Sequence, residues 1–575
     1  MRLSVLLVFM FVSGFVNGQV PTTRFERSDS TQTPTYQEII DWWRNMDEES
    51  SMVKMLTMGI TDAGYPLNLV IVSGNSDTDL GLIRRRNKRI ILINNGIHPG
   101  EPDGIDASML LVRDIVIGKY KLPSNIALAI IPVYNIGGCL NRSADYRVDQ
   151  NGPEEFGFRG NSENYDLNRD FIKADSKDAR AFAEIFHLLD PDVFVDNHVS
   201  DGADYQHVMT LLTSQHNKLG GVMGEFMYKR FEPGIWENMK QKGYDLIPYV
   251  NFWGSSKVED GWQEFWDSPR YGSGYASLFN CFAFVPETHM LKPYGQRVHS
   301  TYALMLSFIE FTSANSEQIR ATREAAKRAT ISASSFPVRW KADRSASRSI
   351  TFRGFESGYR NSDISGLPRL YYDRNKPYTK EIPFYDGYTA TDEIKKPKAY
   401  IIPQGWWKVI ELLKLNKVRM QAFRSDTTIE VEVYHIEDFK AGARPYEGHH
   451  MNTEVKVRTS IEKVRYRKGD FLVPMNQAAN RFLIETLEPQ AEDSYFAWNF
   501  FDPILSQKEG YSAYSFEDIA ADYLKQNPEL RKQLEEKKAG DSSFANNASA
   551  QLNYVYQNSI WFEPAYLRYP VTRIN

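Results

Sequence analysis

The stretch Ile90-Ile91-Leu92-Ile93-Asn94-Asn95-Gly96-Ile97-His98-Pro99-Gly100-Glu101 joins an aliphatic run to a polar turn that contains Gly and Pro. Such a run is typical of a strand that is buried on both faces of a sheet. The turn residues place the start of a helix near Pro102, and a helical pattern follows from Ile105 to Ile117. The stretch therefore predicts a strand, a turn and a helix in that order, which is the repeating unit of α/β folds.

Short apolar runs and longer helical patterns alternate in the same way from Tyr36 to about Thr330. Three further strand-like runs and one helical pattern extend the sheet and its cover of helices: residues 126–133, 193–195 and 282–285, and then 298–311. We expect an α/β domain over residues 19–330.

The alternation of apolar runs and helical patterns ends at about Thr330. Residues 332–337 and 360–383 are predicted to be loop-rich, and a second apolar alternation begins at Ala399. We expect a smaller α+β domain over residues 331–575, in which no pattern indicates catalysis. The vicinal pair His449-His450 cannot readily chelate one ion, so we interpret it as part of a solvated loop.

The N-terminus has the pattern of a signal peptide. One Arg precedes an apolar stretch from Leu3 to Val12, and small residues follow up to Gly18. The stretch is much shorter than the roughly 20 residues that a membrane-spanning helix needs, and no later segment reaches that length. We predict cleavage after residues 1–18 and export to the periplasm or the outside of the cell, with a retained N-terminal anchor as the alternative.

Composition limits the partners and the site chemistry. The chain has 575 residues, 42% of them hydrophobic, and a formal net charge of −5, so it can bury a large core and offers no broad cationic face for nucleic acid. Its two cysteines, Cys139 and Cys281, cannot form a disulfide framework. They either pair with each other or remain buried thiols. A metal site would have to use His and carboxylate ligands.

Two strand ends carry a candidate set of metal ligands. His98 and Glu101 follow the first strand at a strand-to-helix junction, where both side chains can converge on one cation. His198 follows the strand-like run 193–195, and open α/β sheets bind ligands at the carboxyl ends of their strands. Two histidines and one carboxylate leave a tetrahedral Zn²⁺ one open position for water. We therefore predict one Zn²⁺ per chain.

A third strand end and a polar loop add candidate catalytic groups. Glu287 follows the run 282–285 and is a candidate general base for the water. The loop 158–171 contains Arg159 and Arg169, and a guanidinium beside the metal could hold an oxyanion or bind a carboxylate. Asp166 in the same loop could orient a metal-binding histidine through its second ring nitrogen.

These motifs resemble, in order and spacing, those of the zinc carboxypeptidases of the carboxypeptidase A type. The resemblance covers roughly residues 36–311, about half of the chain. It implies a mixed sheet of eight strands between helices, and it implies the following roles: His98, Glu101 and His198 bind Zn²⁺, Glu287 is the general base, Arg159 polarises the carbonyl, Asn168 and Arg169 hold the substrate carboxylate, and Asp166 is the partner of the first zinc histidine.

Two departures leave alternatives open. The family pattern Asn-Pro-Asp-Gly near the second strand end is Asn135-Ile136-Gly137-Gly138 here, so Arg142 and Arg147 remain rivals of Arg159. The tyrosine that closes over substrate is either Tyr271 or Tyr275, and we assign it to Tyr275; the glycines between them would permit motion.

The resulting hypothesis is an exported zinc metallocarboxypeptidase that removes C-terminal residues from peptides with a free C-terminus. One alternative is a related zinc amidohydrolase that acts on cell-wall peptides or acylated amino acids, since the same metal ligands and base would serve it. The other is a non-catalytic binding protein with a degenerate site, in which the C-terminal domain carries the function.

Overall fold

The computed structural model describes residues 22–250 and 258–575. The described residues form two compact units: those up to 327 together with 342–389, and residues 328–341 together with 390–575. The segment 342–389 thus packs with the first unit, although it lies beyond the boundary that we expected near residue 330. The predicted signal peptide, residues 1–18, lies outside the described residues.

The first unit is built on a mixed sheet. Its main path has eight strands in the order β1-β2-β4-β3-β5-β10-β7-β8, and β6 pairs with β10 beside this path, which confirms the predicted fold class. The neighbours β3, β4, β5 and β10 run parallel, whereas β1, β2 and β7 pair in antiparallel fashion. The strands are β1 (Val53–Ile60), β2 (Pro66–Ser73), β3 (Arg89–Asn94), β4 (Ile126–Ile131), β5 (Val193–Asp196), β6 (His198–Ser200), β7 (Met209–Thr213), β8 (Ile247–Pro248) and β10 (Phe282–His289).

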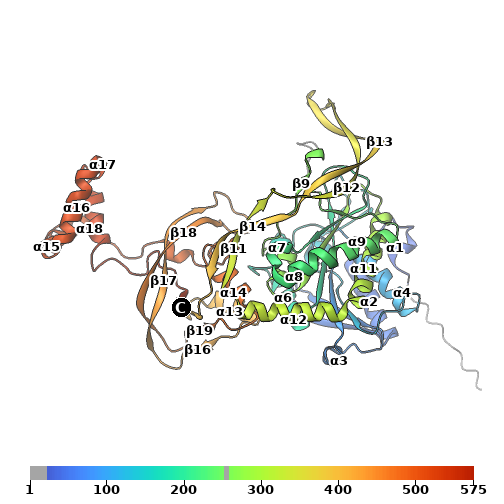
Figure 1. Cartoon of the computed structure of the whole chain (residues 1–575), viewed down its shortest axis with the longest axis horizontal. Coiled ribbons are helices and arrows are strands. Elements are labelled where there is room, and N and C mark those ends of the chain that lie inside the picture. The colour runs from blue at the N-terminus through green and yellow to red at the C-terminus, as the bar shows by residue number, and fades with distance from the viewer. Residues whose placement is uncertain (1–21, 251–257) are drawn as a thin grey trace, which may run out of the picture. The chain divides into compact units, whose positions relative to one another are not determined.

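Helices connect and cover these strands (Figure 1). Thr35 and Glu38 form a capping box that starts α2, and Ser176 caps α6. The α-helices up to residue 332 are α1 (Arg24–Arg27), α2 (Tyr36–Glu49), α3 (Leu80–Arg85), α4 (Asp103–Val116), α5 (Ile136–Leu140), α6 (Lys177–Leu189), α7 (His216–Leu219), α8 (Gly221–Phe226), α9 (Glu232–Gln241), α10 (Gly272–Ser277), α11 (Tyr294–Ala314) and α12 (Ser316–Ser332).

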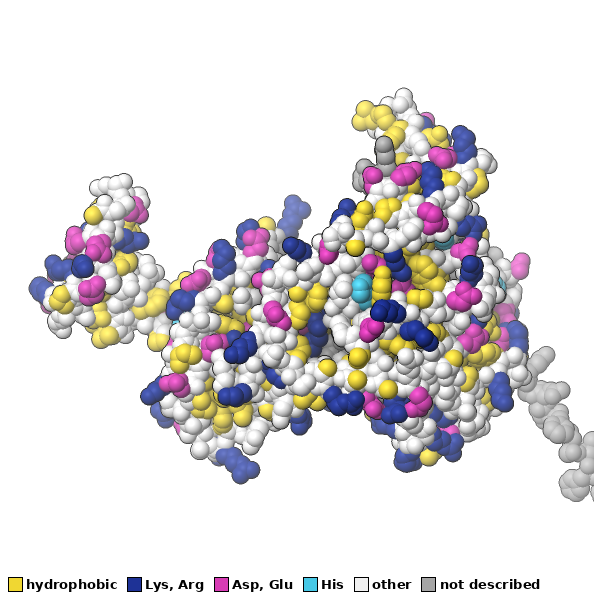
Figure 2. Space-filling model, viewed as in Figure 1, with side chains coloured by type: hydrophobic (Ala, Val, Ile, Leu, Met, Phe, Trp, Pro, Cys, Tyr) yellow, Lys and Arg dark blue, Asp and Glu magenta, His cyan; other side chains and the backbone are white. Residues whose placement is uncertain are grey.

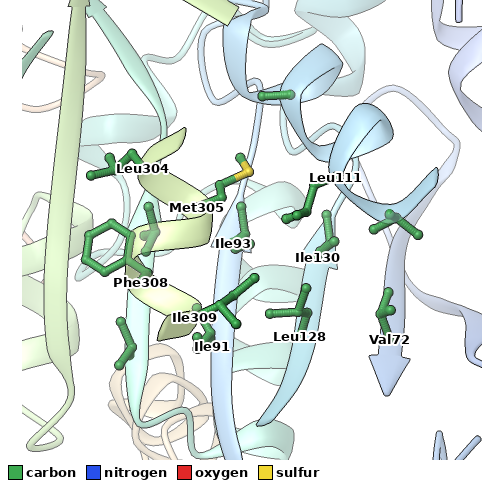
Figure 3. Packing of buried hydrophobic residues seen from close by; sticks show 14 of the residues in the cluster. Val72, Ile91, Ile93, Leu111, Leu128, Ile130, Leu304, Met305, Phe308 and Ile309 are labelled. Carbon is green, nitrogen blue, oxygen red and sulfur yellow. The ribbon is translucent and has the colours of Figure 1, made fainter. Parts of the chain in front are cut away.

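Both faces of the sheet are covered. Figure 3 shows Leu304, Met305 and Phe308 of α11 against Ile93 and its neighbours on β3 and β4. Because successive residues of a strand point to opposite faces, the residue between Val193 and Val195 must face away from this core. That residue is Phe194, and its ring contacts Phe182 and Phe186 of α6. The strands are therefore buried on both sides, which explains their continuous aliphatic runs.

A long hairpin follows in the first unit where we predicted loops. Strands β12 (Arg348–Asn361) and β13 (Pro368–Tyr385) pair along most of their length, and the end of β13 also pairs with β9 (Trp262–Gln263). The prediction of loop-rich sequence over 360–383 was wrong because β13 has many charged and polar residues and few aliphatic ones. Only the base of the hairpin is buried, where Phe352 and Phe384 pack on Trp262.

The second unit is an α+β structure. Its six-stranded sheet has the order β16-β19-β15-β20-β17-β18, and four helices form a separate small core around Phe516, Phe544 and Tyr556. Its elements are β15 (Ala399–Ile402), α13 (Trp407–Leu415), β16 (Gln421–Ala422), β17 (Thr427–Ala441), β18 (Asn452–Tyr466), β19 (Phe471–Pro474), α14 (Asn480–Leu487), α15 (Ala513–Gln526), α16 (Pro528–Gly540), α17 (Ser542–Ala545), α18 (Ala548–Gln557) and β20 (Thr572–Ile574). Strands β11 (Ser335–Asp343) and β14 (Gly387–Lys395) form a two-stranded sheet.

Three general features bear on the predictions. Cys139 and Cys281 are buried, unpaired thiols. Among the described residues, no helix combines the length and the apolar character needed to cross a membrane. Basic and acidic side chains are interspersed over the face shown in Figure 2, without a broad patch of one sign.

Candidate metal centre and active site

The candidate ligands lie at the carboxyl ends of neighbouring strands. His98 and Glu101 belong to the turn between β3 and α4, and His198 begins β6. The turn sits close to the β5–β6 junction because Gly104 has no side chain: a Cβ atom there would lie 2.6 Å from Cβ of Asn197. The local sequence therefore brings two distant parts of the chain to one point.

Three ligand atoms converge at that point. His98 Nδ1 lies 3.2 Å from Glu101 Oε1, and His198 Nδ1 lies 3.2 Å from Glu101 Oε2. These donor atoms all lie within 4.8 Å of one another, and all three residues are buried. Two imidazole nitrogens and a carboxylate at this separation are the donor set that Zn²⁺ prefers, with room for a further ligand.

The second ring nitrogens face carboxylates. His98 Nε2 is 2.9 Å from Asp166 Oδ1, and His198 Nε2 is 3.2 Å from Asp196 Oδ2. Each histidine therefore presents Nδ1 to the ligand cluster and Nε2 to an acid, which is the arrangement typical of metal-binding histidines. We had expected Asp166 but not Asp196. Strand alternation was the available signal, because residues 196 and 198 point to the same side of an extended chain.

The electrostatics favour a cation at this position. Burial opposes charge on His198, but Asp196 and Glu101 raise its pKa well above the usual value. Burial likewise opposes ionisation of Glu101, yet Arg147 and His98 hold its pKa well below the usual value. The ionised Glu101 and the carboxylates beside the two histidines make this position negative, which suits a divalent metal ion, so the residues present fit Zn²⁺.

Glu287 lies beside the ligands on β10. It is the register partner of His198 in the parallel pairing of β10 with β6, so the two side chains are neighbours on the sheet. Burial raises the pKa of Glu287 to about 8, and the Glu101 charge acts in the same direction, whereas His198 and Arg159 oppose the rise. A buried carboxylate with a raised pKa in a cleft is suited to accept and return a proton near neutral pH.

The three candidate arginines differ in their contacts. The guanidinium of Arg159 binds Asp166 Oδ2 at 2.8 Å, and its side chain stays 46% exposed on the cavity. Arg147 also lines the cavity, but its Nη1 donates to Glu101 Oε1 at 2.8 Å. Arg142 donates instead to the main-chain carbonyls of residues 33, 34 and 155 and does not line the cavity. Arg159 is therefore the arginine best placed to meet a substrate.

Asn168 and Arg169 line the same cavity. Tyr271 also lines it, and its ring lies 4.6 Å from Cζ of Arg169. The structure does not bring Tyr275 into the cavity: this residue is buried on α10, where its hydroxyl lies 3.1 Å from Nε2 of His187. Of the two tyrosines that we considered, Tyr271 is the one at the site.

The cavity has a volume of about 360 Å³. It is lined by the ligand cluster, by Glu287 and by Arg147, Arg159 and Arg169, and apolar side chains complete it. Sequence analysis had not singled out these apolar residues as part of the site, and they come from four separate segments: Leu212, Tyr249, Phe265 and Val285. A cavity with an apolar lining and a few convergent polar groups is the usual form of a small-ligand or peptide site.

Comparisons with known proteins agree with the resemblance seen in the motifs. A family model described as zinc carboxypeptidase matches residues 39–191, the part of the chain that holds the first two candidate ligands and both loop arginines. The match confirms the resemblance to the zinc carboxypeptidases that we stated from the motifs.

Similar proteins are named as carboxypeptidases. "Carboxypeptidase 2" of Trichophyton rubrum is 21% identical over 487 residues, which cover 81% of this chain and 84% of that protein. "Carboxypeptidase 2" of Trichophyton equinum is 22% identical over 426 residues, with coverage of 71% and 73%.

Solved structures of metallocarboxypeptidases are also similar to this chain. The metallo-carboxypeptidase from Burkholderia cenocepacia has 16% identity and a TM-score of 0.37, over 49% of this chain and 70% of that one. The carboxypeptidase A from Helicoverpa armigera has 14% identity and a TM-score of 0.34, over 49% of this chain and 74% of that one.

Proposed function

We propose that this protein is an exported carboxypeptidase that binds one Zn²⁺ through His98, Glu101 and His198 and removes C-terminal residues from peptides. The observation that carries the proposal is the convergence of these three ligands with Glu287 in one cavity, since neither the spacing of the motifs nor the family match requires it. When bound, zinc supplies a Lewis acid for the scissile carbonyl and lowers the pKa of a coordinated water.

Glu287 is the proton carrier in this proposal. Its carboxylate takes the proton from the attacking water and returns it to the nitrogen of the leaving amine. The parallel register with His198 supports the role because the carboxylate then lies next to one of the proposed metal ligands. Burial of the acid supports it too, because a proton bound in a dry site is retained until the leaving group accepts it.

Arg159 stabilises the negative charge that develops on the carbonyl oxygen. The contact with Asp166 fixes two of its nitrogens, which leaves the guanidinium preorganised before substrate binds. The same Asp166 orients His98, so one carboxylate positions both a metal ligand and the group that polarises the carbonyl.

Asn168 and Arg169 select the free C-terminus of the peptide. A guanidinium binds a carboxylate with two parallel hydrogen bonds, and the neighbouring amide adds a further donor. This pair supports an exopeptidase rather than an endopeptidase, because a peptide that continues past the cleavage site carries no carboxylate to bind there.

Export is the remaining part of the proposal. The apolar stretch from Leu3 to Val12 and the small residues after it support removal of residues 1–18 and a periplasmic or extracellular location. Mass spectrometry of the N-terminus after expression in the native host tests this part separately from the chemistry.

The test of the chemistry combines metal analysis with a peptide library. We expect one equivalent of zinc per chain and sequential loss of residues from the C-terminus of free peptides, with no cleavage of the same peptides when they are amidated. Equal cleavage of both sets would contradict the exopeptidase proposal, and cleavage of muropeptides alone would favour the zinc amidohydrolase. A chain that retains no zinc and cleaves nothing would favour the binding protein.

A further inference from the structure

One wall of the cavity is completed by a part of the chain far from the ligands. The segment from Trp262 to Ser273 contributes Phe265 and Tyr271 to the cavity. It begins with β9, which pairs in parallel with the end of β13: Trp262 lies opposite Phe384 and Gln263 opposite Tyr385. The β12–β13 hairpin therefore supports this wall, although the hairpin lies outside residues 39–191, which the family model matches.

The segment after β13 binds the main chain of the wall. The backbone N–H of Glu264 donates to the carbonyl of Tyr385 at 2.8 Å, and the hydroxyl of Tyr388 donates to the carbonyl of Glu264 at 2.6 Å. The ring of Tyr388 also packs on Trp266, with 4.9 Å between centroids. These contacts flank Phe265 on both sides in the sequence, so they fix the backbone from which it projects.

Aromatic contacts connect Phe265 with the proposed carboxylate-binding group. The ring of Phe265 meets Tyr271 edge to face, with centroids 5.3 Å apart and planes inclined at 77°. The ring of Tyr271 in turn lies 4.6 Å from Cζ of Arg169, within the range of a cation–π contact. Arg169 also donates to the carbonyl of Asn168 at 2.9 Å. These contacts restrict the long side chain of Arg169, which has four torsions, to a narrow range of orientations.

We propose that the β12–β13 hairpin contributes to substrate binding. Through Phe265 and Tyr271 it positions the guanidinium of Arg169 to receive the C-terminal carboxylate. The inference rests on the proposed function of Arg169. Tyr271 and Tyr388 are positioning residues in this scheme, because they act through Arg169 and not on the reacting atoms. Its consequence is that residues after the predicted boundary near 330 contribute to substrate affinity.

The first test is a double-mutant cycle on the stacked pair, with the best-cleaved free peptide of the library as substrate. Tyr271→Leu removes the ring, and we expect KM to rise about fivefold with kcat within about twofold of the wild type. Tyr271→Phe keeps the ring face and should restore KM. In an Arg169→Ala background, Tyr271→Leu should raise KM no further, because the group that it positions is gone.

The second test addresses the segment that directly follows the hairpin, at the start of β14. Tyr388→Leu removes both the hydrogen bond to the wall and the packing on Trp266, and we expect a rise in KM of about threefold that also disappears in the Arg169→Ala background. Tyr359→Leu is the matched control, because Tyr359 lies on β12 of the hairpin, away from the wall, with 68% of its surface exposed. If Tyr388→Leu fails to fold, Tyr388→Phe keeps the ring and removes only the hydroxyl contact, with the same direction expected.

The outcomes separate this inference from the proposed function. An unchanged KM in Arg169→Ala would remove the carboxylate assignment itself. A raised KM in Arg169→Ala with a wild-type KM in Tyr271→Leu or in the Tyr388 variants would overturn only the positioning role. Equal effects of Tyr271→Leu with and without Arg169 would likewise overturn it, since they would indicate a general disturbance of the cavity.

Discussion

His98 and Asp166 are joined by a contact of 2.9 Å between Nε2 and Oδ1, although 68 positions separate them in the chain. The contact fixes the ring of His98 so that Nδ1 faces Glu101. Because a histidine ring can flip when nothing holds its second nitrogen, this pair decides whether the ligand cluster is formed before the metal arrives.

The first prediction concerns this contact. Asp166→Asn keeps the size of the side chain but removes its charge, so His98 is held less firmly and Zn²⁺ should bind about 10- to 100-fold more weakly. Competition with a chromophoric chelator measures the dissociation constant. Asp149→Asn is the control, because Asp149 is an exposed acid close by in the sequence. Equal zinc affinities in the three proteins would show that Asp166 does not orient the ligand.

The second prediction concerns the proposed base. Glu287→Gln preserves the shape of the side chain and cannot carry the proton, so we expect kcat to fall by about 10²- to 10⁴-fold while one equivalent of zinc is retained. Stopped assays with a free peptide and metal analysis of the same preparation provide the two measurements. A variant that turned over at the wild-type rate would have to use another base.

The third prediction distinguishes the arginines. Arg159→Met should lower kcat by about 10²-fold or more, because a donor to the developing oxyanion is lost. Arg142→Met should leave kcat near the wild-type value, since Arg142 binds main-chain carbonyls away from the cavity. Steady-state kinetics of both variants, with zinc content checked, decides between them. A larger loss of kcat in Arg142→Met would reverse the assignment.

The fourth prediction concerns stability in acid. His207 and His289 each use one ring nitrogen as donor to a carbonyl and the other as acceptor from a backbone N–H, so neither ring can take a second proton without losing a hydrogen bond. Burial, with smaller contributions from nearby cations, lowers the pKa of each to about 4.

The sign follows from the lowered pKa. Above the unfolded value of about 6.5 both histidines are neutral in both states, and the stability they contribute is fully present. As the pH falls from 6.5 to 4, His207 and His289 become protonated in the unfolded chain but stay neutral in the folded chain. The free energy of unfolding should therefore fall by up to about 3 kcal/mol per histidine.

Urea unfolding at pH 7 and pH 4.5 measures this loss. The variant in which both histidines are replaced by Gln keeps a donor and an acceptor at each position and should lose less stability over the same range. A pH dependence identical to that of the wild type would place the acid sensitivity elsewhere.

The convergence of the proposed ligands and base could be predicted from the sequence because each group follows a short apolar run that is typical of a buried strand. The carboxyl ends of parallel strands meet at one edge, so His98, His198 and Glu287 had to lie near one another once the sheet order was right. Tyr275 could not be excluded in this way: both it and Tyr271 belong to one short segment, and the sequence does not show which of the two faces the core.

The β12–β13 hairpin, in contrast, could not be predicted from the sequence. β13 is stabilised by its pairing with β12 and by a few buried contacts at its base, such as Phe384 on Trp262. Little of this is visible locally, because most side chains of the strand are charged or partly exposed and give no clear period.

The sequence by itself determined the α/β class, the sheet with both faces buried and the residue types at three strand ends, because these depend on local patterns of apolar residues. Only the tertiary structure decided which nitrogen of each histidine faces the cluster, which arginine is exposed on the cavity and which distant strand completes its wall. Those choices depend on contacts between segments far apart in the chain, and the direction of a side chain is set by its packing neighbours rather than by its neighbours in sequence.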